Sequence, residues 1–158
     1  MSRKVENGKS AYICGPLTEL SPEDQQWVKE FYRQIADLCQ AVVGIRGFVP
    51  HEHYDPIKHA NFSPPEVDEA ERCQVCECTS VLIVVAVAPS WGGGIEVEMA
   101  NQSGVPVILV CEREKLRQKK ISRLLRGNPA VAAVIEYDTA VEALANLRRE
   151  LAKLPVPA

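Results

Sequence analysis

The residues with the clearest chemical potential lie in one segment, residues 89–99, which reads PSWGGGIEVEM. Three consecutive glycines after an apolar run let the backbone approach a ligand and direct amides at it, at a helix N-terminus that favours anions. Ser90 adds a hydrogen-bond donor. Glu96 is expected in the first turn of the helix, where the helix dipole keeps a carboxylate ionised, as a nucleophile requires. A glycine run by itself is more often a flexible connection between elements. Here the presence of Ser90 and Glu96 beside it favours a ligand-binding or catalytic site.

Glu98 is the competing carboxylate in this segment. Two positions along a helix rotate a side chain by about 200°, so Glu96 and Glu98 cannot face one pocket. We therefore expect one of them to be a solvated surface residue.

A second cluster with possible chemistry is Cys73-x-x-Cys76-x-Cys78, which could hold zinc if a histidine of the 51–62 loop supplied the fourth ligand. No second C-x-x-C accompanies it, and the three cysteines lie within a helical pattern. Structural thiols are therefore favoured, and we expect neither a metal nor a cofactor.

Strand and helix signals alternate along the chain and predict a single domain over residues 1–158, with a polar N-terminal tail at 1–9. Strands are expected at 10–15, 48–50, 81–88, 105–111 and 131–137. Helices are expected after the capping residues Ser21, Ser63 and Thr139, and at 95–103 and 116–127. This order predicts an α/β fold with a doubly wound, five-stranded parallel sheet, flavodoxin- or Rossmann-like, in strand order 2-1-3-4-5 with helices on both faces.

In that strand order, ligands bind outside the carboxyl ends of the first and third strands, where the order reverses. The two loops there are Gly15-Pro16-Leu17-Thr18 and residues 89–94, which are also the most unusual loops by composition. The expected strand order and the composition of the loops therefore indicate the same binding site.

Composition narrows the class of function. The 158 residues carry a net charge of −3 without a stripe of Lys and Arg, which argues against nucleic-acid polymers as partners. The longest apolar run, residues 81–88, is too short to span a bilayer, and no secretory signal is recognised. Six cysteines without an export signal indicate reduced thiols in the cytoplasm.

Three motifs resemble the nucleoside 2-deoxyribosyltransferase superfamily, and within it most closely the 2′-deoxynucleoside 5′-phosphate N-hydrolases. They are Tyr12-Ile13-Cys14-Gly15, Pro89-Ser90-x-Gly-x-Gly94-x-Glu96 and Ser122-x-x-x-Arg126-Gly127. The resemblance extends from about Tyr12 to Tyr137, and the PSxGxGxE motif is its most specific part.

The resemblance implies a role for each matching residue. Glu96 stands at the nucleophile that forms a glycosyl ester, and Tyr12 at the tyrosine beside it. Ser90 matches a serine that holds the 5′-phosphate. Ser122 matches a serine that reaches this phosphate from the partner subunit of a homodimer, and we do not expect a single chain to bring Ser122 and Ser90 to one pocket. A helix cap is the alternative role for Ser122.

Other residues are expected to surround the substrate. His51 could bind base or sugar, or simply satisfy loop carbonyls, and Trp91 could stack on a base or form a wall. The expected binding residues are Gly15, Pro16, Leu17, His51, Ser90, Trp91, Gly92, Gly94 and Ser122.

The chain departs from the family pattern at the general acid. The family has an aspartate eight residues before one that opens the third strand, and here these positions are Arg72 and Ser80. Glu71, one residue away, is the expected acid that assists base departure, and Asp68 is a second candidate. An arginine often seen in the first loop of the family is absent from residues 15–21.

Together these residues suit cleavage of a C–N glycosidic bond through an oxocarbenium-like state, trapped by one carboxylate while a second acid protonates the base. The expected function is hydrolysis of a (deoxy)nucleoside 5′-monophosphate to free base and sugar phosphate. Base exchange by a deoxyribosyltransferase is the alternative. The replaced aspartates also leave open a nucleotide-binding module without turnover.

Overall fold

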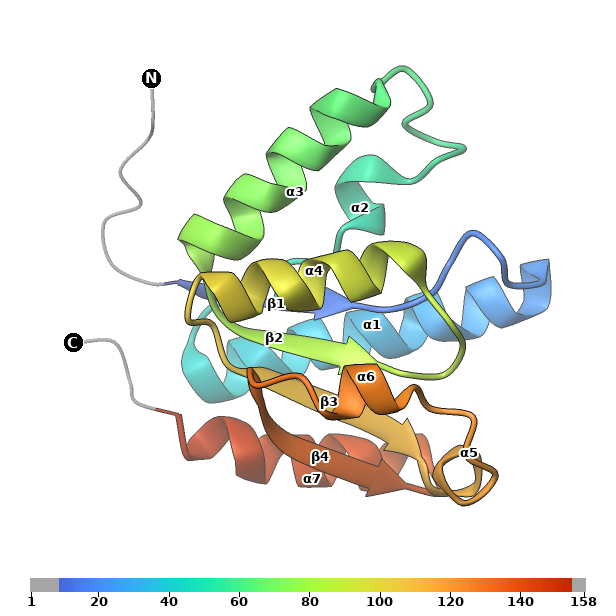
Figure 1. The fold of residues 1–158 in the computed structure, drawn as a ribbon, viewed down its shortest axis with the longest axis vertical. Coiled ribbons are helices and arrows are strands. Elements are labelled where there is room, and N and C mark those ends of the chain that lie inside the picture. The colour runs from blue at the N-terminus through green and yellow to red at the C-terminus, as the bar shows by residue number, and fades with distance from the viewer. Residues whose placement is uncertain (1–8, 155–158) are drawn as a thin grey trace.

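Four parallel strands form the centre of the protein: β1 (Ser10–Cys14), β2 (Thr79–Val85), β3 (Val107–Glu112) and β4 (Val131–Tyr137), in the order β1-β2-β3-β4 (Figure 1). The structure is a computed structural model that describes residues 9–154, so the tail expected at 1–9 lies outside the described residues except for Lys9. All residues of β2 but Ser80 are buried, as its run of apolar side chains requires of a strand covered on both faces.

The predicted strand at 48–50 is reduced to a single bridge, in which Phe48 pairs with Tyr12 on the side of β1 opposite β2. Pro50 lacks the N–H group that would extend the pairing, and the chain turns at once into α2 (His51–Tyr54). The five-stranded sheet in the order 2-1-3-4-5 is therefore wrong in detail. The α/β fold with a parallel sheet flanked by helices is confirmed.

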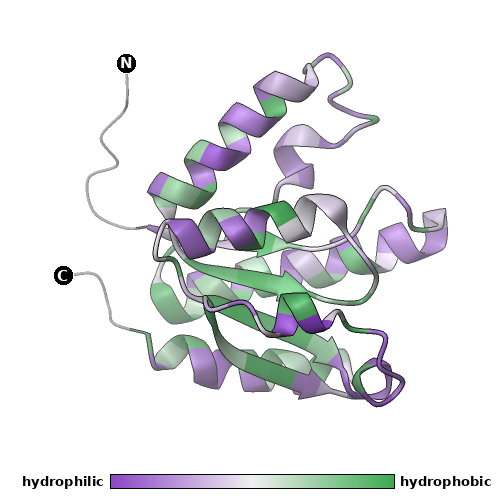
Figure 2. Ribbon diagram, viewed as in Figure 1, coloured by the Kyte–Doolittle hydropathy of each residue, from purple (hydrophilic) through white to green (hydrophobic). Residues whose placement is uncertain are grey.

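Long helices cover both faces of the sheet. α1 (Pro22–Val43) and α7 (Ala140–Ala152) pack on one face, whereas α3 (Pro64–Cys78) and α4 (Trp91–Gln102) pack on the other (Figure 1). The expected starts of α1, α3 and α7 are confirmed, since the side chains of Ser21, Ser63 and Thr139 accept hydrogen bonds from first-turn amides. Apolar residues concentrate on the strands, and polar residues on the outer helix surfaces (Figure 2).

β1 divides its side chains between the two layers because successive residues of a strand point to opposite faces. Ala11 and Ile13 join the core under α1 and α7. Tyr12 and Cys14 join the core under α3 and α4. This alternation directs Tyr12 towards α4.

Two predicted helices differ from those observed. α4 begins at Trp91 and not at residue 95, because the glycines adopt helical conformation and the Ser90 side chain caps them. The helix predicted at 116–127 is instead two short helices, α5 (Arg113–Arg117) and α6 (Arg123–Arg126). Lys119, with a φ of 58°, interrupts the helical path between them.

Candidate active site

A cavity of about 830 Å³ opens at the carboxyl ends of β1 and β2, where the sequence placed the site. The loops after these strands line it together with α2, α3 and α4. Of the residues expected to bind substrate, it contains Gly15, Pro16, Leu17, His51, Ser90, Trp91 and Gly92, and it also contains Glu71 and Glu96.

Tyr12 and Glu96 form a buried pair at this cavity. The Tyr12 hydroxyl donates a hydrogen bond to Glu96 Oε1 at 2.5 Å. Tyr12 has no exposed surface, and Glu96 is 7% exposed. Burial raises the pKa of Tyr12 far above its ordinary value, and the Glu96 charge raises it further, so the hydroxyl remains a donor. The contact joins two residues 84 positions apart that the sequence assigned to one site.

The electrostatics of Glu96 differ from those expected. Glu96 is the sixth residue of α4, in its second turn, because the helix begins earlier than predicted. Burial raises its pKa, and hydrogen bonds from Cys14 and Tyr12 lower it again without reversing the net shift. The expected place of Glu96 in the first turn of the helix is therefore wrong, and it is the donors on β1 that oppose the upward shift of its pKa.

Glu71 on α3 is the second carboxyl group of the cavity. Its pKa is raised to about 7 by burial, by the charge of Glu96 and by that of Asp68. Near neutral pH it is therefore partly protonated, as an acid that protonates a leaving group must be.

The competing acids occupy other surroundings. Glu98 is exposed and lies at a different cavity from Glu96, as the helical rotation predicts, where it accepts a hydrogen bond from Asn128 at 3.1 Å. Asp68 pairs with Arg72 at 2.9 Å across exposed side chains, although it also lines a cavity of about 470 Å³ that includes Glu71 and Glu96. Arg72, at the aligned position of the family aspartate, is exposed.

A cavity of about 720 Å³ lies on the other side of the N-terminus of α4. Ser90, Gly94 and Ser122 all line it within one chain. The expectation that a single chain cannot bring Ser90 and Ser122 to one pocket is therefore wrong, because the break at Lys119 lets α6 lie beside α4. Both serines also cap helices: Ser90 accepts from Gly93 N–H at 3.1 Å and Ser122 from Leu125 N–H at 3.3 Å.

Two lysines that line this second cavity, Lys115 and Lys120, were not predicted from the sequence as site residues. Lys115 donates to the Val87 carbonyl, and Lys120 is exposed. The basic segment KLRQKK, residues 115–120, could have indicated them, but most of it falls within the single helix predicted over 116–127.

Gly15 has a steric role beside the first cavity. A Cβ at this position would clash with the Tyr32 hydroxyl, which donates to the Pro16 carbonyl at 2.7 Å. Gly93 similarly faces Cys14, whose Sγ would lie 3.1 Å from an added Cβ. An added Cβ at Gly92 or Gly94 would meet no neighbouring atom within 4 Å, so these glycines leave open space at the cavities.

The histidines of the 51–62 segment separate into three environments. His51 is half-buried in the first cavity, and burial together with Lys29 lowers its pKa. His53 stacks on Phe48, with ring centroids 4.6 Å apart. His59 accepts the Asp55 N–H at Nδ1.

All six cysteines are free thiols. Within residues 9–154, no group of three or more His, Cys, Asp or Glu side chains is arranged to hold a metal ion. None of the helices in that range is long and apolar enough to cross a membrane.

Solved structures with the same fold include three with near-complete coverage. Clostridium botulinum CMP N-glycosidase, BcmB, is 20% identical, with 90% of this chain and 99% of that chain covered at a TM-score of 0.59. BlsM is 18% identical, with coverage of 92% and 91% and a TM-score of 0.65. A conserved protein from Enterococcus faecalis V583 is 18% identical, with coverage of 90% and 96% and a TM-score of 0.56. The resemblance seen in the sequence is thus confirmed at the level of the fold.

No protein-family model matches the chain, and no curated protein matches it in sequence.

Proposed function

We propose that this protein is a nucleotide N-glycosidase of the nucleoside 2-deoxyribosyltransferase superfamily, which hydrolyses a nucleoside 5′-monophosphate to free base and sugar phosphate. The observation that carries this proposal is that Glu96 lines one cavity with Glu71 and accepts a hydrogen bond from Tyr12, which is buried behind it. The motif resemblance and the shared fold with a CMP N-glycosidase support it. Glu71 also supplies the acid that the substitutions at Arg72 and Ser80 had put in question.

The first chemical step forms a covalent intermediate. The Glu96 carboxylate attacks the anomeric carbon, C1′, and the C1′–N bond breaks with its electron pair passing to the base. Glu71 transfers its proton to that base, which leaves neutral, so the acid is consumed as its carboxylate. The product on the protein is a glycosyl ester of Glu96.

The second step returns the enzyme to its starting state. The Glu71 carboxylate takes a proton from water, whose oxygen attacks C1′ while the ester bond to Glu96 breaks. Sugar phosphate leaves, Glu96 is again ionised and Glu71 is again protonated. Because the Tyr12 hydroxyl donates to Glu96, it stabilises the carboxylate both before attack and as a leaving group.

The 5′-phosphate is assigned to the N-terminus of α4, where Ser90, Gly92 and Gly94 lie between the two cavities. First-turn amides of a helix lack partners within the helix and favour an anion. Ser122 and Lys120 line the second cavity together with Ser90 and Gly94. They offer a hydroxyl and a positive charge in a chain without the family arginine at 15–21.

A homodimer is part of the proposal. Trp91 and Leu124 line the second cavity and are 92% and 88% exposed. Large apolar side chains exposed beside a polar site are typical of surfaces that a partner covers. A second copy seated here would shield both cavities from water.

The deciding experiment is incubation with a panel of nucleosides and nucleoside monophosphates, ribo and deoxy, followed by chromatography for free base. We expect base release from monophosphates. Exchange of the base with a second free base would instead indicate a deoxyribosyltransferase. Binding of a monophosphate without base release would overturn the enzyme assignment.

A further inference from the structure

A partly buried ion pair, Lys29–Asp55, lies next to residues that line the 830 Å³ cavity. The Asp55 carboxylate follows α2, is 4% exposed and accepts a hydrogen bond from Lys29 Nζ of α1 at 2.9 Å. A buried carboxylate without such partners is strongly unfavourable. The chain between α2 and α3 is therefore tied to α1 at this point.

Asp55 also organises the backbone that follows it. Its Oδ1 accepts from the N–H groups of Ile57 and Lys58, at 2.9 and 3.0 Å. Its own N–H donates to His59 Nδ1 at 3.0 Å, and the His59 N–H donates to the Asp55 carbonyl at 2.8 Å. One buried residue thus fixes the backbone of a turn whose other residues are largely exposed.

The neighbours of Asp55 form the cavity wall. His51 and Tyr54 precede it, Pro56 follows it, and all three line the cavity that contains Glu71 and Glu96. Tyr12, Glu71 and Glu96 belong to β1, α3 and α4. Movement of the Asp55 turn would therefore displace the wall against which a substrate rests and leave the reacting groups in place.

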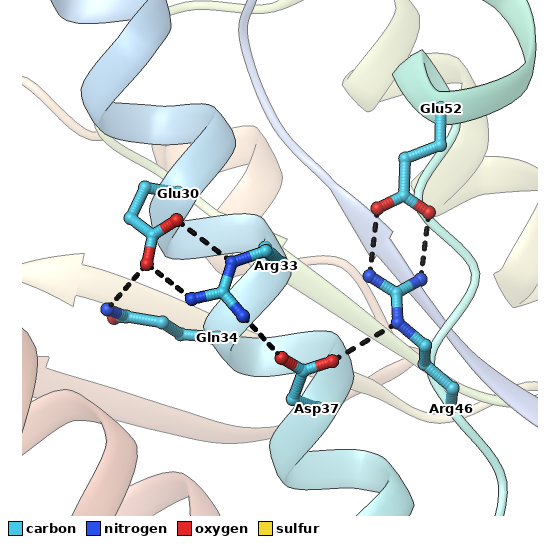
Figure 3. A network of polar contacts seen from close by, with 6 residues as sticks. All are labelled: Glu30, Arg33, Gln34, Asp37, Arg46 and Glu52. Atoms are coloured by element: carbon cyan, nitrogen blue, oxygen red, sulfur yellow. Dashed lines mark hydrogen bonds and ion pairs between the residues drawn. The ribbon is translucent and has the colours of Figure 1, made fainter.

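A second ion pair holds the same helix from the solvent side, and it provides a matched control. Arg46 contacts both carboxylate oxygens of Glu52 at 2.8 Å and Asp37 at 3.2 Å, in a network that continues to Arg33 and Glu30 (Figure 3). The side chains of Arg46 and Glu52 are 38% and 32% exposed. Exposed pairs of this kind contribute little to stability.

We propose that Lys29 and Asp55 are positioning residues, which hold His51, Tyr54 and Pro56 as the substrate-binding wall of the active site. The two residues do not touch the reacting atoms. For its kinetic consequence the inference rests on the proposed function, whereas its structural consequence is measurable on the protein alone.

The test uses Asp55→Asn, Lys29→Met and the control Glu52→Gln. In substrate-free protein, hydrogen–deuterium exchange of residues 51–59 is expected to be faster in the first two variants and unchanged in the control. In the base-release assay with CMP, KM is expected to rise about tenfold, the loss of roughly one hydrogen bond, with kcat within about twofold. Lys29→Arg, which keeps a cationic donor, is expected to retain the wild-type hydrogen–deuterium exchange and the wild-type KM.

The outcomes separate the two proposals. The positioning role is overturned if hydrogen–deuterium exchange is unchanged in the folded Asp55 and Lys29 variants. It is also overturned if exchange is faster but KM is unchanged, or if kcat falls without a change in KM. If the wild-type protein releases no base from any monophosphate of the panel, the proposed function fails, and the Kd of CMP replaces KM for this test. If Asp55→Asn does not fold, Lys29→Met alone decides, since its side chain is 28% exposed and less disruptive to replace.

Discussion

The two cavities that meet at the N-terminus of α4 differ in charge. Among its described lining residues, the 830 Å³ cavity has Glu19, Glu71 and Glu96 and no Lys or Arg. The 720 Å³ cavity has Lys115 and Lys120 against a single acid, Glu98. A cation beside Glu71 would lower its pKa and remove the proton that base departure requires. In the proposed mechanism, this separation keeps the lysines that would bind the phosphate away from Glu71, which is partly protonated near neutral pH.

Of the substitutions that test this comparison, replacement of Glu96 in the acidic cavity is expected to have the largest effect on activity. Glu96→Gln keeps the shape of the side chain but removes the nucleophile, and base release should fall on the order of 10⁴-fold or more. Steady-state kinetics with the preferred monophosphate, on protein shown to be folded by its melting temperature, measures this.

Glu98→Gln is the matched control, two positions along the same helix and in the other cavity. It should retain most of the activity. Loss of turnover in the Glu98 variant together with an active Glu96 variant would reverse the assignment.

Glu71 is expected to give the next largest effect. Glu71→Gln removes the proton donor and should lower kcat by about 10²–10⁴-fold. Because the acid must be protonated, and its pKa is raised to about 7, the wild-type rate should fall as the pH rises above about 7. The variant should lack this basic limb. Asp68→Asn should keep the limb, and an unchanged pH profile in Glu71→Gln would exclude Glu71 as the acid.

The smallest effects are expected in the lysine-containing cavity. Ser122→Ala and Lys120→Ala should each raise KM for monophosphates by about three- to tenfold, because each removes one contact to phosphate. The weak reaction with unphosphorylated nucleosides should not change. Equal loss with both substrate types would show that these residues only support the fold.

Mixing two variant subunits tests whether Ser122 acts within its own chain or at the site of its partner. Light scattering should give a dimer. Since Ser90 and Ser122 line one cavity within a chain, mixing Glu96→Gln subunits with Ser122→Ala subunits should recover no wild-type sites. Recovery of a fraction of normal sites would show that Ser122 serves its partner's phosphate instead.

The sequence was most informative where one local pattern determines one element. The caps at Ser21, Ser63 and Thr139 predicted three helix starts, and the apolar run at 81–88 predicted the central strand. The two loops predicted to meet do line one cavity. These features depend on neighbours in the chain or on the regular connection of a parallel sheet.

The errors arose where distant packing decides between two local choices. Nothing in residues 91–94 distinguishes a glycine loop from a first helical turn, and the capping contact of Ser90 decides it. The raised pKa of Glu96 follows from burial of its side chain in the folded protein, which sequence spacing does not reveal. The helix break at Lys119 depends on a positive φ, for which lysine has no special preference. The positions of Ser122 and Lys120 could therefore not be predicted from the sequence.

The contact between Gly15 and Tyr32 restricts the order in which this site can change over evolutionary time. A Cβ at Gly15 would lie 2.3 Å from the Tyr32 hydroxyl and 2.9 Å from the ring carbon Cζ, so a side chain there requires Tyr32 to be moved or replaced. Shortening Tyr32 first leaves the Pro16 carbonyl without its donor, at a cost of about 1–3 kcal/mol for a buried unpaired group. Each single step is therefore unfavourable, and a joint replacement avoids the loss only where a new donor reaches the Pro16 carbonyl. This steric barrier to single substitutions holds the first loop in its present form, in addition to its proposed role in binding.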